Sequence, residues 1–331
     1  MIPPAPRANP SLFGHDEAAS GLAAAARSGR LHHAWLLCGP PGIGKATLAY
    51  RFARWLLAGQ PPGADPLHVP ENDPAFRRVA AASHPDMMVL EPQSEPGKRR
   101  IIKVDEARAA RGFLNFTAAE GGWRVVVMDE VDTMEAASAN TILKTLEEPP
   151  PRTVLLLITS SPGRLLPTIR SRCRRLDLFG LDEPTMDRVL TEWLPDLPRL
   201  DRQVLIRLAE GSPGRALELA EGEGVELARL AEAVLENLPT GASAHALADR
   251  IAGRDAALAF PAFFTLLLRQ LSHAVREAAR GGPAAGWLGT RPLSAWVEAA
   301  DAVARLVQEA ERLSLDRRQT VLVAMNTLRG R

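Results

Sequence analysis

A glycine-rich segment restricts the fold of this chain more than any other feature. The segment is Gly39-Pro-Pro-Gly-Ile-Gly-Lys45, which fits the pattern G-x-x-x-x-G-K and separates an apolar run at 34–38 from a helical pattern at 46–58. Backbone N–H groups of such a loop wrap phosphate groups, the lysine adds positive charge, and the N-terminus of the following helix favours an anion. The segment therefore predicts a nucleotide-binding loop between a buried strand and a helix.

The predicted phosphate-binding residues depart from the motif at one position. They are Gly39, Gly42, Gly44, Lys45, Ala46 and Thr47. The motif expects Ser or Thr directly after the lysine, because that hydroxyl ligates Mg²⁺. Ala46 stands there instead, and Thr47 points about 100° further round the helix. We therefore expect ATP or ADP to bind, with metal-assisted hydrolysis weak or absent. A glycine-rich turn without any ligand is the less favoured alternative.

A second motif lies at the end of a later apolar run. Residues 125–128 are Val-Val-Val-Met, and the carboxylates of Asp129 and Glu130 follow directly. In the Walker B pattern, the first carboxylate holds Mg²⁺ and the second orients or deprotonates the attacking water. Acidic residues are common at strand ends, but the presence of a phosphate-binding loop in the same chain favours the functional interpretation.

Strand and helix patterns alternate up to residue 178, which predicts an α/β domain with a parallel sheet. Nearly continuous apolar runs are typical of strands that are covered by helices on both faces. We predict strands at 34–38, 87–90, 123–128 and 154–159, and helices at 16–28, 46–58, 104–113 and 133–147. Asp132 and Glu135 are expected to cap the last of these helices. Irregular structure is expected at 2–10, where the tail should be extended or loose, and at 60–74.

Beyond residue 178 the pattern is only helical, and Gly211-Ser-Pro-Gly214 interrupts it. Because 331 residues are too many for one ordinary domain, we expect three parts: 1–178, a small helical domain at 179–222, and a helical domain at 223–331.

Composition excludes several classes of protein. The net charge of +1 provides no global attraction to nucleic acid or to an anionic membrane, so any DNA contact has to be local. The run 98–100, with Arg108 and Arg111, could touch DNA phosphates, although such charge runs are usually solvated surface. Two cysteines, Cys38 and Cys173, exclude a disulfide framework and fit a reducing cytoplasm. No apolar run approaches the roughly 18 residues of a membrane span.

Three groups of residues give the chain a family resemblance. Residues 140–150, Asn-Thr-Ile-Leu-Lys-Thr-Leu-Glu-Glu-Pro-Pro, follow the Walker B carboxylates, and Leu166-Pro-Thr-Ile-Arg170 leads into Ser171-Arg172-Cys173. Shorter matches are Leu12-Phe-Gly-His15, Leu31-His-His-Ala34 and His84-Pro-Asp86. The chain thus resembles the AAA+ subunits of bacterial replicative clamp loaders, most of all the delta-prime branch. The resemblance covers about 10–220 and is most specific at 122–176.

The resemblance implies roles for further residues. It implies an AAA+ domain, a small helical lid and an all-α C-terminal collar domain that mediates oligomerisation. Arg172 corresponds to an arginine finger that reaches the γ-phosphate of a neighbouring subunit, although a plain surface arginine is the alternative reading. Ser160 corresponds to the sensor-1 position and Arg215 to sensor-2. The family often carries a four-cysteine zinc module, but 61–82 contain no cysteine, so no zinc is predicted.

The predicted function is that of a delta-prime-type clamp-loader subunit in DNA replication. The resemblance implies assembly with gamma/tau and delta subunits to load the sliding clamp on primed DNA, within a polymerase holoenzyme but without polymerase activity of its own. An active gamma/tau-type ATPase is the first alternative, which nucleotide turnover by the isolated chain would reveal. An unrelated AAA+ remodelling ATPase, such as a Holliday-junction helicase, is the second, which co-purification with loader subunits would exclude. We expect a cytoplasmic location.

Overall fold

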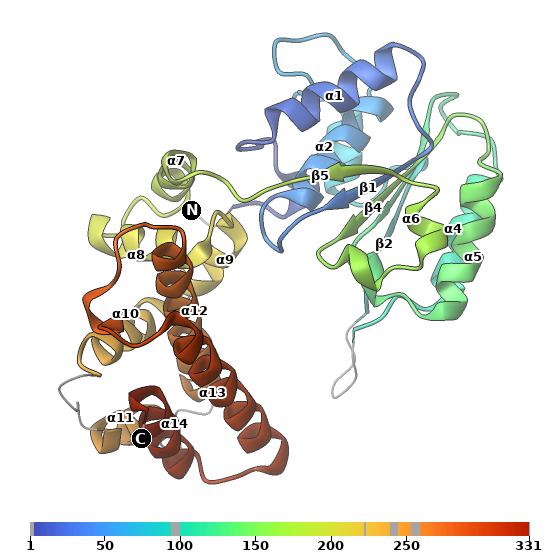
Figure 1. Ribbon diagram of the computed structural model, residues 1–331. Coiled ribbons are helices and arrows are strands. Elements are labelled where there is room, and N and C mark those ends of the chain that lie inside the picture. Colours follow the sequence, from blue (N-terminus) through green and yellow to red (C-terminus); the bar gives the residue numbers. More distant parts are fainter. Residues whose placement is uncertain (1–2, 94–99, 222, 239–243, 253–258, 331) are drawn as a thin grey trace. The chain divides into compact units, whose positions relative to one another are not determined.

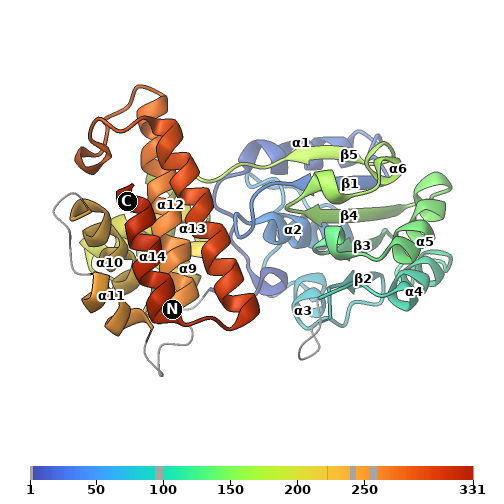
Figure 2. The same ribbon diagram turned by 60° about the horizontal axis from the view of Figure 1, so that its bottom comes forward.

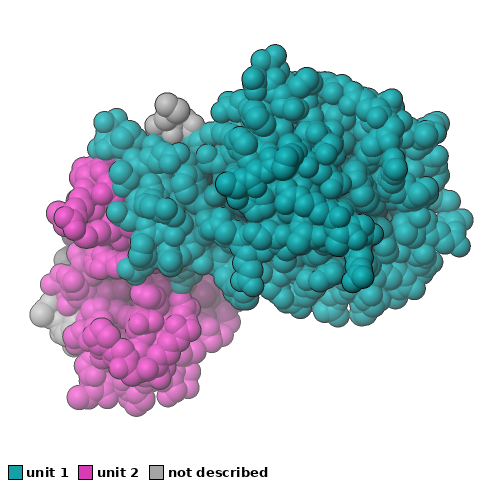
Figure 3. Space-filling view, turned by 90° about the horizontal axis from the view of Figure 1, so that it is seen from above, with its two compact units in different colours: residues 1–196, 210–215 teal, residues 197–209, 216–331 magenta. Residues whose placement is uncertain are grey.

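The computed structural model describes residues 3–93, 100–221, 223–238, 244–252 and 259–330 (Figure 1). The chain forms two compact units, coloured separately in Figure 3. The α/β unit comprises residues 1–196 and 210–215, and the helical unit comprises 197–209 and 216–331. The residues predicted to form a separate lid, 179–222, are therefore shared between the two units.

A five-stranded parallel sheet forms the centre of the α/β unit. Figure 2 shows the strands side by side in the order β2-β3-β4-β1-β5. The bounds are β1 Ala34–Cys38, β2 Met87–Leu90, β3 Arg124–Met128, β4 Thr153–Thr159 and β5 Arg174–Asp177. All four pairings are parallel. The predicted α/β fold class is confirmed, and so are the four predicted strands, whereas β5 was not predicted.

Helices cover both faces of this sheet because β1, β3 and β4 are buried and apolar on both sides. Alternate strand residues, such as Leu37 and Leu156, pack with α1 Asp16–Arg27, α2 Lys45–Leu57 and α3 Pro74–Ala80. Their neighbours, such as Leu36 and Leu155, pack with α4 Val104–Leu114, α5 Ala136–Glu147 and α6 Pro167–Arg170. The sheet is thus the middle of three layers, and its strand ends carry the loops that follow β1, β3 and β4.

The tail at 2–10 was predicted to be extended or loose, and its described part is extended apart from one helical turn and is held against the domain. It contains a short 3-10 helix, η1 Pro6–Ala8. Arg54 of α2 donates to the carbonyls of Arg7 at 3.1 Å and Asn9 at 2.6 Å. Burial lowers the pKa of Arg54 to about 10. Buried guanidinium groups satisfy their donors on backbone carbonyls, and in doing so they attach the tail to the domain.

The start of α5 also differs from its prediction. A 3-10 helix, η2 Val131–Thr133, precedes it, and α5 begins only at Ala136. Its N-cap, Glu135, makes no side-chain cap hydrogen bond. Asp132 instead accepts a hydrogen bond from the Thr159 hydroxyl at 2.7 Å. The predicted capping residue therefore ties β4 to the segment after β3.

Every regular element after β5 in the described residues is helical, as the sequence predicts. These elements are α7 Glu183–Trp193, α8 Arg199–Ala209, α9 Pro213–Ala220, α10 Gly224–Glu236, α11 Ala244–Ile251, α12 Ala259–Ala279, η4 Gly286–Leu288, α13 Leu293–Leu313 and α14 Arg317–Arg329. One continuous apolar core joins α8, α10, α11, α12, α13 and α14. Among the described helices, none has the length and apolar character needed to cross a membrane.

Candidate nucleotide site and finger

The predicted phosphate-binding loop joins the end of β1 to the start of α2. Gly44 is the N-cap of α2 and has a φ of 105°, while Gly42 has a φ of 72°. Both values lie in the region that only glycine adopts without strain. The predicted loop residues therefore adopt the strand–loop–helix arrangement, with Lys45 as the first residue of α2.

Lys45 is buried and bonded to its own domain. Its Nζ donates to the carbonyls of Gly39 at 2.8 Å and Pro40 at 2.6 Å, and to the Ser160 hydroxyl at 3.0 Å. Burial lowers the pKa of Lys45, and the nearby carboxylates, Asp129 first, oppose this shift. The structure thus brings Lys45 and Ser160 together across 115 positions of sequence.

The two residues after Lys45 provide no hydroxyl in the motif position. Ala46 packs against the apolar core on the α1–α2 side of the sheet. Thr47 is 8% exposed and follows in the first turn of α2. The nearest hydroxyl in sequence therefore belongs to Thr47, one residue after the motif position and about 100° further round the helix.

The Walker B carboxylates lie in different environments at the end of β3. Asp129 accepts a hydrogen bond from the Glu130 N–H at 2.9 Å, and burial raises the pKa of its carboxyl group. Glu130 has a φ of 47°, and its Oε1 lies 3.3 Å from Nη1 of Arg100. An acidic group beside Lys45 suits Mg²⁺ held between a nucleotide and the protein, but Asp129 would be its only protein ligand among the predicted residues.

Three further residues hold the loop and were not assigned to the site from the sequence. The Ser212 hydroxyl donates to Pro41 O at 2.9 Å, and Gly214 N donates to Gly42 O at 2.9 Å. A Cβ on Gly214 would lie only 2.9 Å from Gly42 Cα, so the two backbones touch directly. From the other side, Nε2 of His15 donates to Ile43 O at 2.8 Å. The start of α9 and the start of α1 therefore fix the conformation of the loop.

The predicted sensor-2 residue, Arg215, does not make these contacts. Its backbone N–H donates to the Ser212 hydroxyl at 3.2 Å, which caps α9. Its guanidinium lies 3.4 Å from the carboxylate of Glu210. The contacts of this segment with the loop are made by Ser212 and Gly214, and the Arg215 guanidinium is not among them.

Arg172 lies outside the Lys45 cluster, just before the edge strand β5. Its Nη2 is 2.7 Å from Oε1 of Glu147 at the end of α5, and its Nη1 donates to Thr168 O at 3.0 Å. The side chain is 35% exposed. Cys173 is a packed thiol whose pKa burial raises to about 12. Neither Glu147 nor Thr168 belongs to the loop from Gly39 to Lys45.

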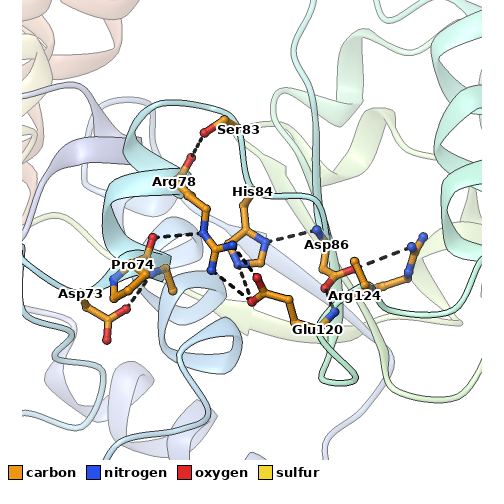
Figure 4. A network of polar contacts seen from close by, with 10 residues as sticks. Asp73, Pro74, Arg78, Ser83, His84, Asp86, Glu120 and Arg124 are labelled. Carbon is orange, nitrogen blue, oxygen red and sulfur yellow. Dashed lines mark hydrogen bonds and ion pairs between the residues drawn. The ribbon is translucent and has the colours of Figure 1, made fainter.

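The His84-Pro-Asp86 segment serves the fold (Figure 4). The buried Asp86 carboxylate accepts the backbone N–H groups of Ala119 at 2.7 Å and Glu120 at 3.0 Å, and Arg124 lies 3.7 Å away. Nδ1 of His84 accepts from Asp86 N, which leaves the proton of the neutral ring on Nε2. Burial lowers the pKa of His84. The network fixes the loop between α4 and β3.

The basic residues predicted as possible DNA contacts are partly paired. Arg100 faces Glu130, and Arg108 pairs with Asp105 at 3.0 Å. Lys98 and Arg99 lie outside the described residues. Within the described part of the chain, no group of three or more His, Cys, Asp or Glu side chains is arranged to hold a metal ion.

Comparisons with known proteins match the same part of the chain. The family model described as "DNA polymerase III, delta subunit" matches residues 14–182. The delta' subunit of DNA polymerase III from Pseudomonas aeruginosa is 39% identical over 219 residues, 66% of this chain and 65% of that protein. The Escherichia coli delta' subunit is 37% identical over 66% of this chain and 64% of its own length. The matches to these two relatives therefore span slightly less than two thirds of their length.

More distant similarities extend to other subunits. The Escherichia coli tau subunit is 31% identical over 70% of this chain and 36% of its own. A solved structure of a gamma-subunit-related protein from Thermotoga maritima is 19% identical, covering 91% of this chain and 95% of that one, with a TM-score of 0.46.

Proposed function

The chain belongs to the delta-prime family of DNA polymerase III clamp-loader subunits, and on that premise we propose that it serves mainly to complete the ATP site of a neighbouring subunit. In this proposal the neighbours are gamma/tau and delta subunits, and the assembled complex loads the sliding clamp on primed DNA in the cytoplasm. The chain is part of the polymerase holoenzyme without being the polymerase.

The observation that carries the proposal is the environment of Arg172. Its guanidinium is bonded to Glu147 and Thr168, it remains 35% exposed, and these contacts keep it apart from the Lys45 cluster. A guanidinium is always charged and presents a planar fork of donors, which suits the oxygens of a phosphate group. An exposed arginine beside an edge strand is therefore available to a nucleotide that another subunit holds.

Weak hydrolysis at the chain's own site is the second part of the proposal. The loop and Lys45 provide a cradle for ATP or ADP, and Asp129 with Glu130 would hold and activate Mg²⁺ and water. Ala46 lacks the hydroxyl ligand, and Thr47 stands one residue too late, about 100° further round the helix. Nucleotide binding without efficient turnover follows from this combination, since phosphate groups are cradled by the backbone whereas hydrolysis depends on the metal.

An active gamma/tau-type ATPase stays the second candidate because both Walker B carboxylates are retained at the end of β3. Brisk Mg²⁺-dependent turnover by the isolated chain would favour it. The third candidate, an unrelated AAA+ remodeller, is abandoned because the chain belongs to the clamp-loader family.

Substitution of Arg172 in a reconstituted loader tests the proposal. Arginine fingers contribute on the order of 10³–10⁵ in rate, or about 4–7 kcal/mol of barrier, and a ring with several sites will show less in bulk turnover. We expect Arg172→Ala to lower clamp-stimulated ATPase by at least about tenfold, with folding and assembly unchanged. Arg172→Lys should restore little because a point charge cannot replace the fork. Normal ATPase and clamp loading by the alanine variant would show Arg172 to be an ordinary surface residue.

A further inference from the structure

Arg172 is held at two points although its side chain reaches solvent. Nη2 forms an ion pair with Oε1 of Glu147 at 2.7 Å, and Nη1 donates to Thr168 O at 3.0 Å. The two charged side chains are 35% and 49% exposed, respectively. A guanidinium has five N–H donors, so donors remain for an anion while both contacts persist.

Glu147 is itself placed by a rigid part of the domain. It is the last residue of α5, and the preceding Leu146 is buried in the same core cluster as Ile169 of α6. Nε2 of His33 donates to the Leu146 carbonyl at 3.0 Å, which fixes the end of the helix. Pro149 prevents α5 from continuing. The carboxylate therefore starts from a well-determined backbone position.

We propose that Glu147 is a positioning residue for Arg172. This inference rests on the proposed function, in which Arg172 acts on a neighbour's nucleotide. A free arginine side chain samples many rotamers, and ordering it at the moment of reaction would raise the barrier. The contacts with Glu147 and Thr168 order the guanidinium in advance, so the neighbouring site receives a donor group that is already oriented.

If Glu147 instead restrained Arg172, its removal would change turnover in the opposite direction. A carboxylate also competes with phosphate for the same cation, so a restraining Glu147 would slow the neighbour's site and its removal would speed turnover. Positioning predicts the reverse sign. Exposed ion pairs contribute little free energy, so removal of Glu147 should lower the finger-dependent rate by only about two- to fivefold.

The chain provides a matched control in the next residue. Glu148 is also exposed, carries the same charge and, in the described structure, has no ion pair. Loader should be reconstituted with the wild-type chain, Glu147→Ala, Glu147→Gln, Glu148→Ala, Arg172→Ala and the double variant E147A/R172A. Steady-state ATP turnover is then measured over a range of ATP concentrations, with circular dichroism and assembly checked for each variant.

The expected result is a two- to fivefold fall in kcat for Glu147→Ala with KM unchanged, partial retention by Glu147→Gln, and no effect of Glu148→Ala. The double variant should match Arg172→Ala, because Glu147 acts only through the finger. Unchanged or faster turnover by Glu147→Ala, or a further loss in the double variant, overturns the positioning role while leaving the finger intact. Unchanged turnover by Arg172→Ala would overturn the finger itself, and the positioning role with it.

Discussion

The phosphate-binding loop and the Arg172 segment use their cations in opposite ways. Lys45 is buried and gives its three donors to Gly39, Pro40 and Ser160 of its own domain. Arg172 is partly exposed, and its two anchors leave other donors available. Burial and bonding make the first site self-contained, whereas exposure makes the second accessible to a partner. The exposure of Arg172, together with Ala46 in the chain's own loop, supports the proposal that this chain contributes more to a neighbour's chemistry than to its own.

The conformation of the loop from Gly39 to Lys45 requires that Gly42 has no side chain. This residue has a φ of 72°, and a Cβ there would lie 2.5 Å from the Ser212 hydroxyl. We expect Gly42→Ala to reduce the free energy of unfolding by about 2–4 kcal/mol, from backbone strain plus the clash with Ser212. Urea denaturation monitored by circular dichroism measures the loss.

Gly59 supplies the control for this prediction. Its φ of 78° is similar, but a Cβ would meet nothing within 4 Å. Gly59→Ala should therefore cost only about 1–2 kcal/mol, the strain alone. Equal losses at the two positions would mean that the contact between Gly42 and the start of α9 contributes nothing to stability.

The missing hydroxyl at Ala46 can be tested by measuring ATP turnover at the chain's own site. If a metal ligand is what the chain's own site lacks, Ala46→Thr should raise Mg²⁺-dependent turnover by the isolated chain about tenfold, or ~1.4 kcal/mol of barrier. Ala46→Val has nearly the same shape without the oxygen and should stay at the wild-type rate. A similar rise in both variants, or in neither, would count against the metal-ligand explanation.

A change of pH is expected to have a smaller effect on the stability of the fold. Burial lowers the pKa of His84, and burial followed by the charge of His32 lowers that of His33. Both rings stay neutral in the folded protein at a pH where the unfolded chain already binds protons. Stability should therefore fall as the pH drops below the ordinary histidine value of 6.5.

Denaturation at pH 7.5 and pH 5.5 in urea checks this sign, and the two test pH values bracket the ordinary histidine pKa, about 6.5. His84→Gln should show a smaller difference between the two conditions than the wild type. The exposed His68 provides the control, and His68→Gln should leave the difference unchanged. Greater stability at the lower pH would contradict the assignment of neutral, buried rings.

The sequence revealed four strands of the sheet, including the edge strand β2, but not the other edge strand, β5. Strands β1 to β4 are apolar on both faces, and such runs are recognisable without knowing their partners. β5 reads Arg-Arg-Leu-Asp, because an edge strand exposed to solvent carries charges that prevent further pairing. Its strand state depends on pairing with β1, which no local pattern encodes. The fixed N-terminal tail was missed for a similar reason, since Arg54 binds backbone carbonyls that have no sequence signature.

The same distinction applies to the site. The loop from Gly39 to Lys45 is a contiguous motif, and its chemistry dictates its residue types. The docking of Ser212 on Pro41 joins positions 171 apart, and only the packed structure brings them together. The pattern Gly211-Ser-Pro-Gly214 resembles a helix start, so it predicts a break followed by a capped helix. It does not predict that this helix start packs against the loop at Pro41 and Gly42.

The most direct test of the central claim compares Lys45→Ala with Arg172→Ala, each placed only in this chain of an otherwise wild-type reconstituted loader. Clamp-stimulated ATP hydrolysis is followed under single-turnover conditions, with assembly confirmed for both complexes. Our account predicts a loss of at least about tenfold for Arg172→Ala, from loss of transition-state stabilisation at the neighbouring site, and near-normal hydrolysis for Lys45→Ala. The reverse pattern, with Lys45 essential and Arg172 dispensable, would contradict it and identify this chain as a motor that depends on its own nucleotide site.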